Sequence, residues 1–555
     1  MESKIKIYAI TEKDRSSRRR KIKRTEGITV TIRSHIIRAA MAAVTVFLLI
    51  LTLGCASDTA RESGSRIICG ALTEPHSLCP LLGTDSASTE VQSLLYNALV
   101  RVDASKEITG DLAESWQITD GGTCYTFRLK DGILWHDGKP FGADDVVFTF
   151  RLAKDPSSGY IDARELKNVK SVTAEGQTVT FRLAEADSAF LARLTTVMIL
   201  PRHVWESIKN LREEAPHVKI VGTGPYRLTE WKKAQYLRFA ANESYHLGAP
   251  HIRTLFYKIV PDSNVLAMQL RRGEIDVCYL DSTAKQLLAR DASVRVSEGA
   301  GQAYTYIALN HKRAPFDDRR VRLAMLTAFR RDAVIDRLLG GSAYLAVADL
   351  APSSAGYHSG LQPIAYDADE AAHLLEEAGY TLGEDGIREK DGKKLTLRLL
   401  VSNKNKRLGD AALAFRQNMR EVGIDVEVVP MDFVTMRTKH LLAGDYDACL
   451  ISQRLPIDPL IRAEVWTTSG AGNHMGYESA RIDALYEQAK RADGKERDAI
   501  FRLVQEELLR DMPQLFLWYP SVMIGMRQGI EGIDAEHLGG KDNLFYNAHT
   551  WTKVR

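Results

Sequence analysis

The sequence predicts an α/β protein made of two lobes, and three stretches carry that prediction. Residues 302–328 (QAYTYIALNHKRAPFDDRRVRLAMLTA) begin with the two-residue alternation of a strand, break at Pro315 and continue at helical spacing. Residues 395–451 alternate between strand and helix patterns, which is typical of a largely parallel sheet covered by helices. The apolar run at 514–519 (QLFLWY) indicates a strand that returns to the first lobe. We therefore expect the chain to cross between lobes near 302–328, and the function to lie in the cleft between them.

Residues 1–54 have the composition of an export signal peptide rather than of a folded domain. Residues 1–38 are polar and basic, and residues 39–53 are apolar and uncharged. Gly54-Cys55 follows, as in a bacterial lipobox, so we expect Cys55 to become the lipidated first residue. An ordinary signal peptide and an uncleaved anchor are the alternatives. A start at Val30 would leave a signal of normal length, and residues 1–29 would then be an extension that precedes the true start.

The positive charge of the chain belongs to this leader. Residues 1–54 hold 12 Lys/Arg and 4 Asp/Glu, a net charge of +8, whereas the whole chain carries +3, so the remainder carries about −5. This charge balance does not indicate a nucleic acid or an anionic surface as partner. The remaining 501 residues are enough for two to four compact units.

The cysteines do not indicate a metal site. The sequence has no CxxC and no Cys/His pair at zinc spacing. Cys69 and Cys278 each lie in an expected strand of the first lobe. They either pair in a disulfide or stay as buried free thiols, and the sequence leaves both open.

The remaining elements follow from local patterns. The first lobe is expected to hold strands at 66–71, 124–129 and 275–279 and helices at 89–99 and 262–272. The second lobe is expected to hold strands at 395–401, 424–429 and 446–451 and helices at 410–422, 436–443 and 482–509.

Several stretches, taken in order, resemble one known family. They are LYNALVRVD (95–103), GDLAESW (110–116), YTFRLKDGILWHDGKPFGADDVVFTF (125–150), VGTGPYRLTEW (221–231), GEIDV (273–277), PFDDRRVR (315–322), DADEAAHLLEEAG (367–379) and GYESARIDAL (476–485). This series resembles the family 5 extracellular solute-binding proteins, the dipeptide-, oligopeptide- and nickel-type receptors of ABC importers, over essentially all of residues 65–555.

The resemblance implies a two-lobed periplasmic-binding-protein fold of the class II, or cluster C, type. The first lobe would comprise residues 55–302 with an inserted subdomain at about 97–218, the second lobe 303–519, and residues 520–555 would complete the first lobe. Strands near 304–309 and 515–519 would cross as a hinge, and the lobes would close on a ligand.

The same resemblance implies a receptor and not an enzyme. It would capture a peptide or small molecule without a cofactor or bound metal, and deliver it to an ABC permease with its ATPase. We expect a monomer, exported and lipid-anchored in the cell envelope, which is the periplasmic space in a Gram-negative cell. The alternative within the fold is a receptor for a non-peptide solute, such as a carboxylated compound or a nickel or haem complex.

The second-lobe loop that follows 446–451 is expected to contact the ligand through Gln453, Arg454, Leu455 and Asp458. In dipeptide-type relatives, an aspartate three residues before an Asp-Pro pair holds the peptide amino group, and here that position is Leu455. If Arg454 faces the cleft, its guanidinium suits a carboxylate; the alternative is a pairing with a local acid on the surface. Asp458 is either a ligand contact or a loop-stabilising acceptor.

Two further loops complete the expected site. Asn403 and Lys404 follow the strand at 395–401, where related receptors often place an arginine for the peptide carboxylate. Thr84, Asp85 and Ser86 lie on the loop that resembles the cleft rim of the first lobe.

Enzymatic alternatives have weaker support. The sequence contains no GxSxG, HExxH or GxxxxGK[ST] motif. An SxxK pattern at 282–285 favours a plain helix start, His136-Asp137-Gly138 favours a turn, and Asp144-Asp145 favours a helix cap over a metal site. A secreted hydrolase is therefore the alternative from another class. A cytoplasmic regulator would need a DNA-binding domain for which the N-terminal 38 residues are too short.

Overall fold

The computed structural model describes residues 66–83, 85–160, 163–492, 494–538 and 543–554. The expected signal peptide, Cys55 and Thr84 lie outside these residues. None of the helices in the described ranges combines the length and apolar character that a membrane crossing needs. The lobe limits expected from the sequence stay a prediction, because contacts unite residues 66–555 in one compact unit.

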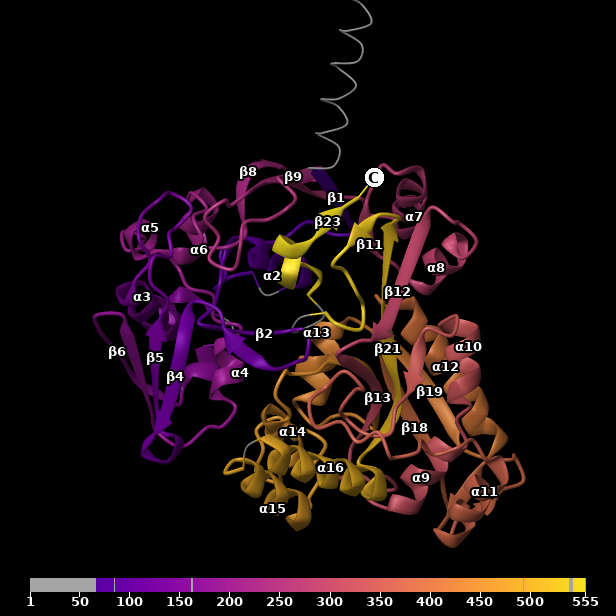
Figure 1. The fold of residues 1–555 in the computed structure, drawn as a ribbon. Helices are drawn as coiled ribbons and strands as arrows, with labels where there is room; N and C mark the ends of the chain where they lie inside the picture. The colour runs from indigo at the N-terminus through magenta and orange to yellow at the C-terminus, as the bar shows by residue number, and fades with distance from the viewer. Residues whose placement is uncertain (1–65, 84, 161–162, 493, 539–542, 555) are drawn as a thin grey trace, which may run out of the picture. The chain divides into compact units, whose positions relative to one another are not determined.

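Twelve of the described strands form one large sheet. They are β1 (Arg66–Ala71), β8 (Tyr226–Lys232), β9 (Tyr236–Ala241), β10 (Thr254–Ile259), β11 (Val277–Tyr279), β12 (Val294–Ala300), β13 (Ala303–Leu309), β14 (Ala343–Leu345), β18 (Thr396–Ser402), β19 (Asp425–Met431), β20 (Ala448–Arg454) and β21 (Gln514–Arg527). Their order is β19–β18–β20–β13–β21–β11–β1–β10–β9–β8, and β12 and β14 also pair with β21. β13 and β21 therefore occupy the middle of the sheet (Figure 1).

Strand β21 belongs to both halves of this sheet. Its first residues pair antiparallel with β13, with Ile307 opposite Leu515. Its last residues pair antiparallel with β11 and β12, with Val277 opposite Met526. The two strands that the sequence predicted to cross between the lobes are thus neighbours at the centre of the sheet, where they form the hinge of the two-lobed fold.

Two large hydrophobic cores flank this centre. The second-lobe core comprises buried residues between Tyr304 and Tyr519, together with Ala189. The first-lobe core comprises buried residues between Ile67 and Val277 and between Ile524 and Trp551. We use "first lobe" and "second lobe" for the parts that hold these cores.

The structure of the second lobe explains why strand and helix patterns alternate in its sequence. Strands β18, β19 and β20 are parallel, as predicted, and helix α12 (Lys406–Glu421) connects β18 to β19. Ala412, Phe415 and Met419 recur at helical spacing and pack into the second-lobe core. The sheet is mixed beyond this point, because β13 pairs antiparallel with β20.

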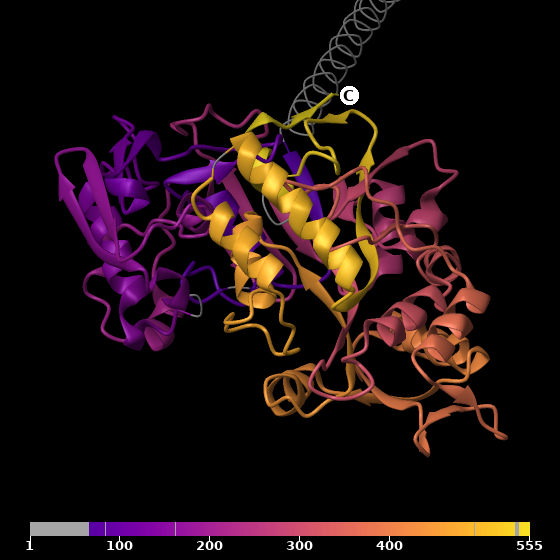
Figure 2. The same cartoon turned by 90° about the horizontal axis from the view of Figure 1, so that it is seen from below.

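The other helices cover the sheets or connect strands. They are α2 (Ser86–Leu95), α3 (Ala143–Lys154), α4 (Phe190–Leu194), α5 (Arg202–Trp205), α6 (Leu211–Glu214), α7 (Ser263–Arg272), α8 (Ser282–Leu288), α9 (Arg319–Thr327), α10 (Arg331–Leu338), α11 (Ala368–Glu377), α13 (Phe433–Thr435), α14 (Ala463–Trp466), α15 (Ala480–Ala489) and α16 (Gly494–Asp511). The sequence predicted a single helix at 482–509, and this prediction is wrong. The segment forms two separate helices, α15 and α16, which lie side by side (Figure 2).

The remaining described strands form small sheets. A four-stranded sheet in the order β4–β5–β7–β6 contains β4 (Ala113–Thr119), β5 (Cys124–Leu129), β6 (Val169–Glu175) and β7 (Thr178–Leu183). The others are β2 (Val100–Val102) with β3 (Ile108–Gly110), β15 (Thr381–Leu382) with β16 (Arg388–Lys390) and β17 (Lys393–Lys394), and β22 (Ile530–Glu531) with β23 (Thr552–Lys553).

Cys69 and Cys278 are buried free thiols, which corrects the disulfide alternative. They lie on the neighbouring parallel strands β1 and β11, where Cys69 is in register with Val277 and Gly70 with Cys278. Successive side chains of a strand point to opposite faces, so the two sulfurs lie on opposite sides of the sheet. Accordingly, Cys69 packs in the first-lobe core and Cys278 in a separate small cluster beside α7.

Candidate functional site

Helix α2 presents one apolar and one polar face. Asp85 caps its first turn by accepting a hydrogen bond from the Ser88 backbone N at 3.0 Å. Val91, Leu94 and Leu95 are buried in the first-lobe core. The opposite face carries polar side chains at helical spacing, namely Ser86, Thr89, Glu90 and Ser93.

This polar face lines a cavity of about 200 Å³, which we call the interlobe cavity. Tyr96, Asn97, Arg101, Asp111 and Tyr245 continue its first-lobe wall. Arg454, the last residue of β20, and Ile457 line it from the second-lobe side. A solute in this cavity would therefore contact residues of both lobes at once.

Glu90 is a half-buried carboxyl group in the wall of this cavity. Burial raises its pKa to about 7, since a charged carboxylate loses solvation there. The positive charge of Arg454 and a hydrogen bond from Tyr279 act in the opposite direction, and Asp85 adds a small further increase. At neutral pH the group lies near the midpoint of its titration.

Tyr96 also lines this wall, but its hydroxyl is enclosed by protein. Its side chain is 1% exposed, and the hydroxyl has no hydrogen-bond partner among the residues that the structure describes. Burial raises the pKa of this phenol well above its ordinary value, so the group stays protonated and can donate. A buried hydroxyl without a partner is costly, and a solute in the cavity does not offset this cost, because the oxygen is inaccessible.

Asp111, at another part of the cavity wall, is already satisfied. Asn97 Nδ2 donates to both carboxylate oxygens at 3.1 and 3.0 Å. His246 Nε2 lies 2.9 Å from Asp111 Oδ1. This network fixes Asp111 within the first lobe and leaves Glu90 as the carboxylate that faces the second lobe.

A second cavity, of about 540 Å³, lies within the second lobe. Its wall includes Arg437, Glu464 and His474, as well as Tyr306, whose hydroxyl donates to Gln453 Oε1 at 3.1 Å. Burial and the charge of Arg437 lower the pKa of His474. The cavity is a second recess next to the end of β20.

Comparison with known proteins identifies the family. Residues 107–459 match the model of the bacterial extracellular solute-binding proteins, family 5. The chain is 30% identical over 486 residues to the oligopeptide-binding protein AppA of Bacillus subtilis, covering 85% of this chain and 89% of AppA. The chain belongs to the family 5 extracellular solute-binding proteins.

Solved structures of family 5 proteins share the fold. The structure of Bacillus subtilis AppA in complex with a nonapeptide is similar with a TM-score of 0.72 at 28% identity, covering 88% of this chain and 99% of AppA. NikZ of Campylobacter jejuni in complex with Ni(L-His) gives a TM-score of 0.72 at 26% identity, covering 88% of this chain and all of NikZ. The expected family and its two-lobed fold are thus confirmed.

The structure brings two of the expected site residues to the interlobe cavity of this family 5 protein. Ser86 lines it from α2, and Arg454 lines it from the end of β20. Arg454 therefore faces the cleft. For this orientation, the sequence analysis expected a ligand with a carboxylate group. Gln453 lines the second cavity instead.

Four other expected residues have different surroundings. Asp85 serves as the cap of α2. Leu455 is 2% exposed and packs in the second-lobe core, so its side chain cannot reach a solute in the cavity. Asn403 and Lys404 are exposed in the turn after β18 and are not among the described residues that line either cavity.

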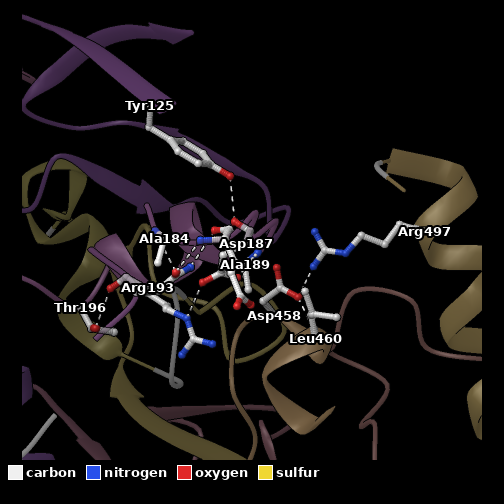
Figure 3. Close-up of polar contacts among 11 residues, drawn as sticks. Tyr125, Ala184, Asp187, Ala189, Arg193, Thr196, Asp458, Leu460 and Arg497 are labelled. Carbon is white, nitrogen blue, oxygen red and sulfur yellow. Dashed lines mark hydrogen bonds and ion pairs between the residues drawn. The ribbon is translucent and has the colours of Figure 1, made fainter. Parts of the chain in front are cut away.

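Asp458 belongs to a charged cluster between the lobes (Figure 3). It forms an ion pair with Arg497 of α16 and accepts a hydrogen bond from the Leu460 backbone N at 2.8 Å. From the first lobe, Asp187 and Arg193 form an ion pair at 3.1 Å. Burial raises the pKa of Asp187, and a hydrogen bond from the Ala189 backbone N opposes this; the charges of Asp458 and Arg497 add smaller effects of opposite sign. These contacts support the loop-stabilising role of Asp458 that the sequence left open.

Sequence analysis missed Glu90 as a residue of the cavity wall. The available signal was the polar stripe of α2, whose members recur three and four residues apart opposite the apolar stripe. The same polar stripe would also suit a helix surface that faces solvent. The sequence does not show whether the stripe faces solvent or the other lobe.

The residues considered for catalysis have structural roles. Ser282 begins α8, and Lys285 pairs with Glu298. Gly138 has a φ of 86° in the predicted turn, and Asp145 accepts a hydrogen bond from the Gly142 backbone N at 3.0 Å at the start of α3. In the described part of the chain, no three His, Cys, Asp or Glu residues are grouped as a metal site requires.

Proposed function

We propose that this chain is the exported solute receptor of an ABC importer, and that it captures a peptide or a similar small solute in the interlobe cavity. The observation that carries the proposal is the composition of the cavity wall, in which α2 of the first lobe faces Arg454 of the second. A solute that touches both lobes binds the closed form better than the open form. Only such a difference in affinity shifts the equilibrium toward closure.

The size and chemistry of the cavity support a small polar solute. Its volume of about 200 Å³ lies below the range of roughly 300–1,000 Å³ that is usual for ligand pockets. Its wall contains the charged side chains of Glu90 and Arg454. AppA was solved with a nonapeptide and NikZ with Ni(L-His), so peptides and a metal–amino-acid complex are the ligand classes to test, and the cavity volume favours short peptides.

The receptor would act by binding and release, without covalent chemistry. It would pass the solute to a membrane permease that a separate ATPase drives. The Gly54-Cys55 junction supports attachment to the cell envelope through a lipid on Cys55. Metabolic labelling with palmitate tests the anchor: we expect labelling of the wild-type chain and none of Cys55→Ser.

A variant that fills the cavity tests the receptor function. Ser86 is exposed at the start of α2 and lines the cavity, so Ser86→Trp should block it without disturbing the core. Ser157→Trp, at an exposed position outside the cavity wall, is the matched control. The probes are a pool of di- and tripeptides and the nickel–histidine complex, and binding is measured by thermal shift and calorimetry.

We expect Ser86→Trp to weaken binding at least about tenfold, equivalent to about 1.4 kcal/mol, at an unchanged melting temperature. The control should bind as the wild type does. Wild-type binding in Ser86→Trp would contradict the assignment of the cavity, and a folded wild-type chain that binds none of the probes would contradict the proposed ligand class.

A further inference from the structure

A groove of about 940 Å³ runs between two neighbouring helices of the second lobe, α10 and α12. Both helices lie on one side of the hinge strand β21, and α2 with the interlobe cavity lies on the other side (Figure 1). The residues that line the groove line neither of the two cavities described above. A molecule bound in this groove, which we call the α10–α12 groove, would therefore leave the interlobe cavity free.

The floor of the α10–α12 groove is apolar. Val334 and Leu338 lie one turn apart on α10, and Leu413 and Ala414 line the groove from α12. Leu413 is 46% exposed, so a molecule in the groove would remove apolar surface from water. The walls are mainly helix surfaces, whose backbone groups are paired within each helix. They suit a third helix, which also pairs its own backbone groups and can lay an apolar stripe along the floor.

The carboxylates of the groove are already paired. Its charged side chains are four arginines and three carboxylates, namely Arg330, Arg337, Arg416, Arg420, Asp410, Glu421 and Asp425. Each carboxylate forms an ion pair with a basic residue of the described chain. The pairs are Lys406–Asp410 at 2.6 Å, Arg330–Glu421 at 3.4 Å and Arg420–Asp425 at 3.6 Å.

Arg337 and Arg416 are the surplus cations of this groove. Both side chains are exposed, one on α10 and one on α12, and in the described part of the chain neither forms an ion pair with a carboxylate. The chain without its expected leader carries about −5, so this local positive charge runs against the net charge of the protein. A partner with negative charge on both flanks of an apolar stripe complements the groove.

We propose that the α10–α12 groove binds an acidic, amphipathic helix of a partner protein, whose apolar stripe covers Leu413 and whose carboxylates pair with Arg337 and Arg416. This inference goes beyond solute binding, because it assigns to the second lobe a contact surface that is separate from the interlobe cavity. Exposed ion pairs contribute little individually, so the apolar floor should supply most of the affinity and the two arginines the choice of partner. An anionic membrane fits less well, since the negative net charge of the chain opposes adsorption to it.

The test uses the full chain and three helix-forming peptides of about four turns each. The peptides share one stripe of leucines, one of which is replaced by photo-leucine. The flanking positions are all glutamate, all glutamine or all lysine. After irradiation, cross-links to α10 and α12 are located and quantified by mass spectrometry of the digested chain. This measurement excludes binding to the basic leader, because cross-links there map to residues 1–54.

Two variants and one control separate the contributions of charge and apolar surface. The variants are the double substitution Arg337→Gln with Arg416→Gln and the single substitution Leu413→Ser. The matched control is the double substitution Arg481→Gln with Arg502→Gln, at exposed positions of α15 and α16 outside the groove. Thermal unfolding verifies that each chain is folded.

We expect the glutamate peptide to cross-link to α10 and α12 of the wild type at least about fivefold more than the glutamine peptide, and the lysine peptide least. The double variant at Arg337 and Arg416 should lose this preference. Leu413→Ser should lower the yield with both the glutamate and the glutamine peptide. The control should behave as the wild type, and solute capture should be the same in all chains.

Two results would overturn the proposal. One is the absence of cross-links in the groove, or a glutamate preference that persists in the double variant. The other is binding to phosphatidylglycerol vesicles that is lost in the double variant without peptide cross-links in the groove, which would identify the surface as a lipid contact. Neither result bears on solute capture, which is measured separately with the di- and tripeptide pool.

Discussion

At the residue scale, the buried hydroxyl of Tyr96 can be removed without loss of stability. Its hydroxyl has no described protein partner, so Tyr96→Phe should leave the melting temperature unchanged or slightly raise it. The affinity for a solute in the cavity should stay at the wild-type value, because the enclosed hydroxyl oxygen does not reach the cavity. Calorimetry with a captured dipeptide and thermal unfolding measure the two effects.

Tyr226→Phe is the matched control. Tyr226 is equally buried, but its hydroxyl donates to the Ile252 backbone O at 3.0 Å. This variant should lose about 1–3 kcal/mol of stability, because an acceptor is left unsatisfied, and should bind normally. A clear loss of stability in Tyr96→Phe would show that the Tyr96 hydroxyl has a hydrogen-bond partner in the folded chain and would contradict this account.

Glu90 makes stability depend on pH in a defined window. Its pKa in the folded chain, about 7, lies above its ordinary value of 4.5. The folded chain therefore holds a proton that the unfolded chain releases between these values, and stability should fall as pH rises through that window. The groups that act on Glu90 are Arg454, Tyr279 and Asp85.

Denaturant titrations of the empty chain between pH 5 and 8 test this expectation. The Glu90→Gln variant keeps a neutral side chain at every pH. Relative to this variant, the wild type should lose about 1–3 kcal/mol of unfolding free energy as the pH rises through the window. If the difference in unfolding free energy between the two chains does not change with pH, Glu90 is ionised throughout this range in the folded chain, and the expectation is wrong.

At the element scale, α2 shows what the sequence could and could not predict. The apolar stripe of Val91, Leu94 and Leu95 was enough to predict a helix, although at 89–99 rather than Ser86–Leu95. The start was missed because the cap at Asp85 lies in a loop rich in capping residues. The role of the polar stripe could not be predicted, since it depends on the lobe that packs opposite.

The end of β20 illustrates the same limit. The loop around Arg454 was predicted to be functional, but the sequence could not decide whether Arg454 faces the cleft. That orientation is set by the register of β20 with β13, which pairs residues about 150 positions apart. The predicted single helix at 482–509 failed for a local reason, because the chain turns before Gly494, whose φ is 47°.

At the scale of the whole molecule, the charged cluster of Figure 3 bears on closure. Asp187 and Arg193 come from the first lobe and Asp458 and Arg497 from the second, and Ala189 between the first two packs in the second-lobe core. Alternating charges across the lobes should favour the closed form, and removal of one cation would leave two carboxylates facing each other.

Arg497→Met should therefore speed release of a bound dipeptide roughly tenfold and change its association rate much less. Arg502→Met, at an exposed position of the same helix, is the control and should behave as the wild type. Stopped-flow fluorescence gives both rates. An unchanged release rate in a folded Arg497→Met chain would mean that the cluster stabilises the lobes individually and not their closure.

The large-scale organisation was the most predictable part of this protein. The strand–helix alternation, the hinge strands and the resemblance of many short stretches all follow from local patterns that the structure preserves. The cavity was less predictable, because Glu90 and Arg454 meet there only through the packing of two lobes. Leu455, an expected contact, turns inward because it packs within the core of the second lobe.

Native mass spectrometry of the full chain, isolated from the cells that produce it, tests the central claim most directly. Unfolding then releases any bound solute for identification, with Glu90→Gln and Arg454→Gln treated in parallel. We predict a peptide or a similar small solute whose occupancy falls in both variants, because Glu90 and Arg454 line the interlobe cavity. A released solute whose occupancy is the same in the wild type and in both variants would place binding outside the interlobe cavity and contradict the account.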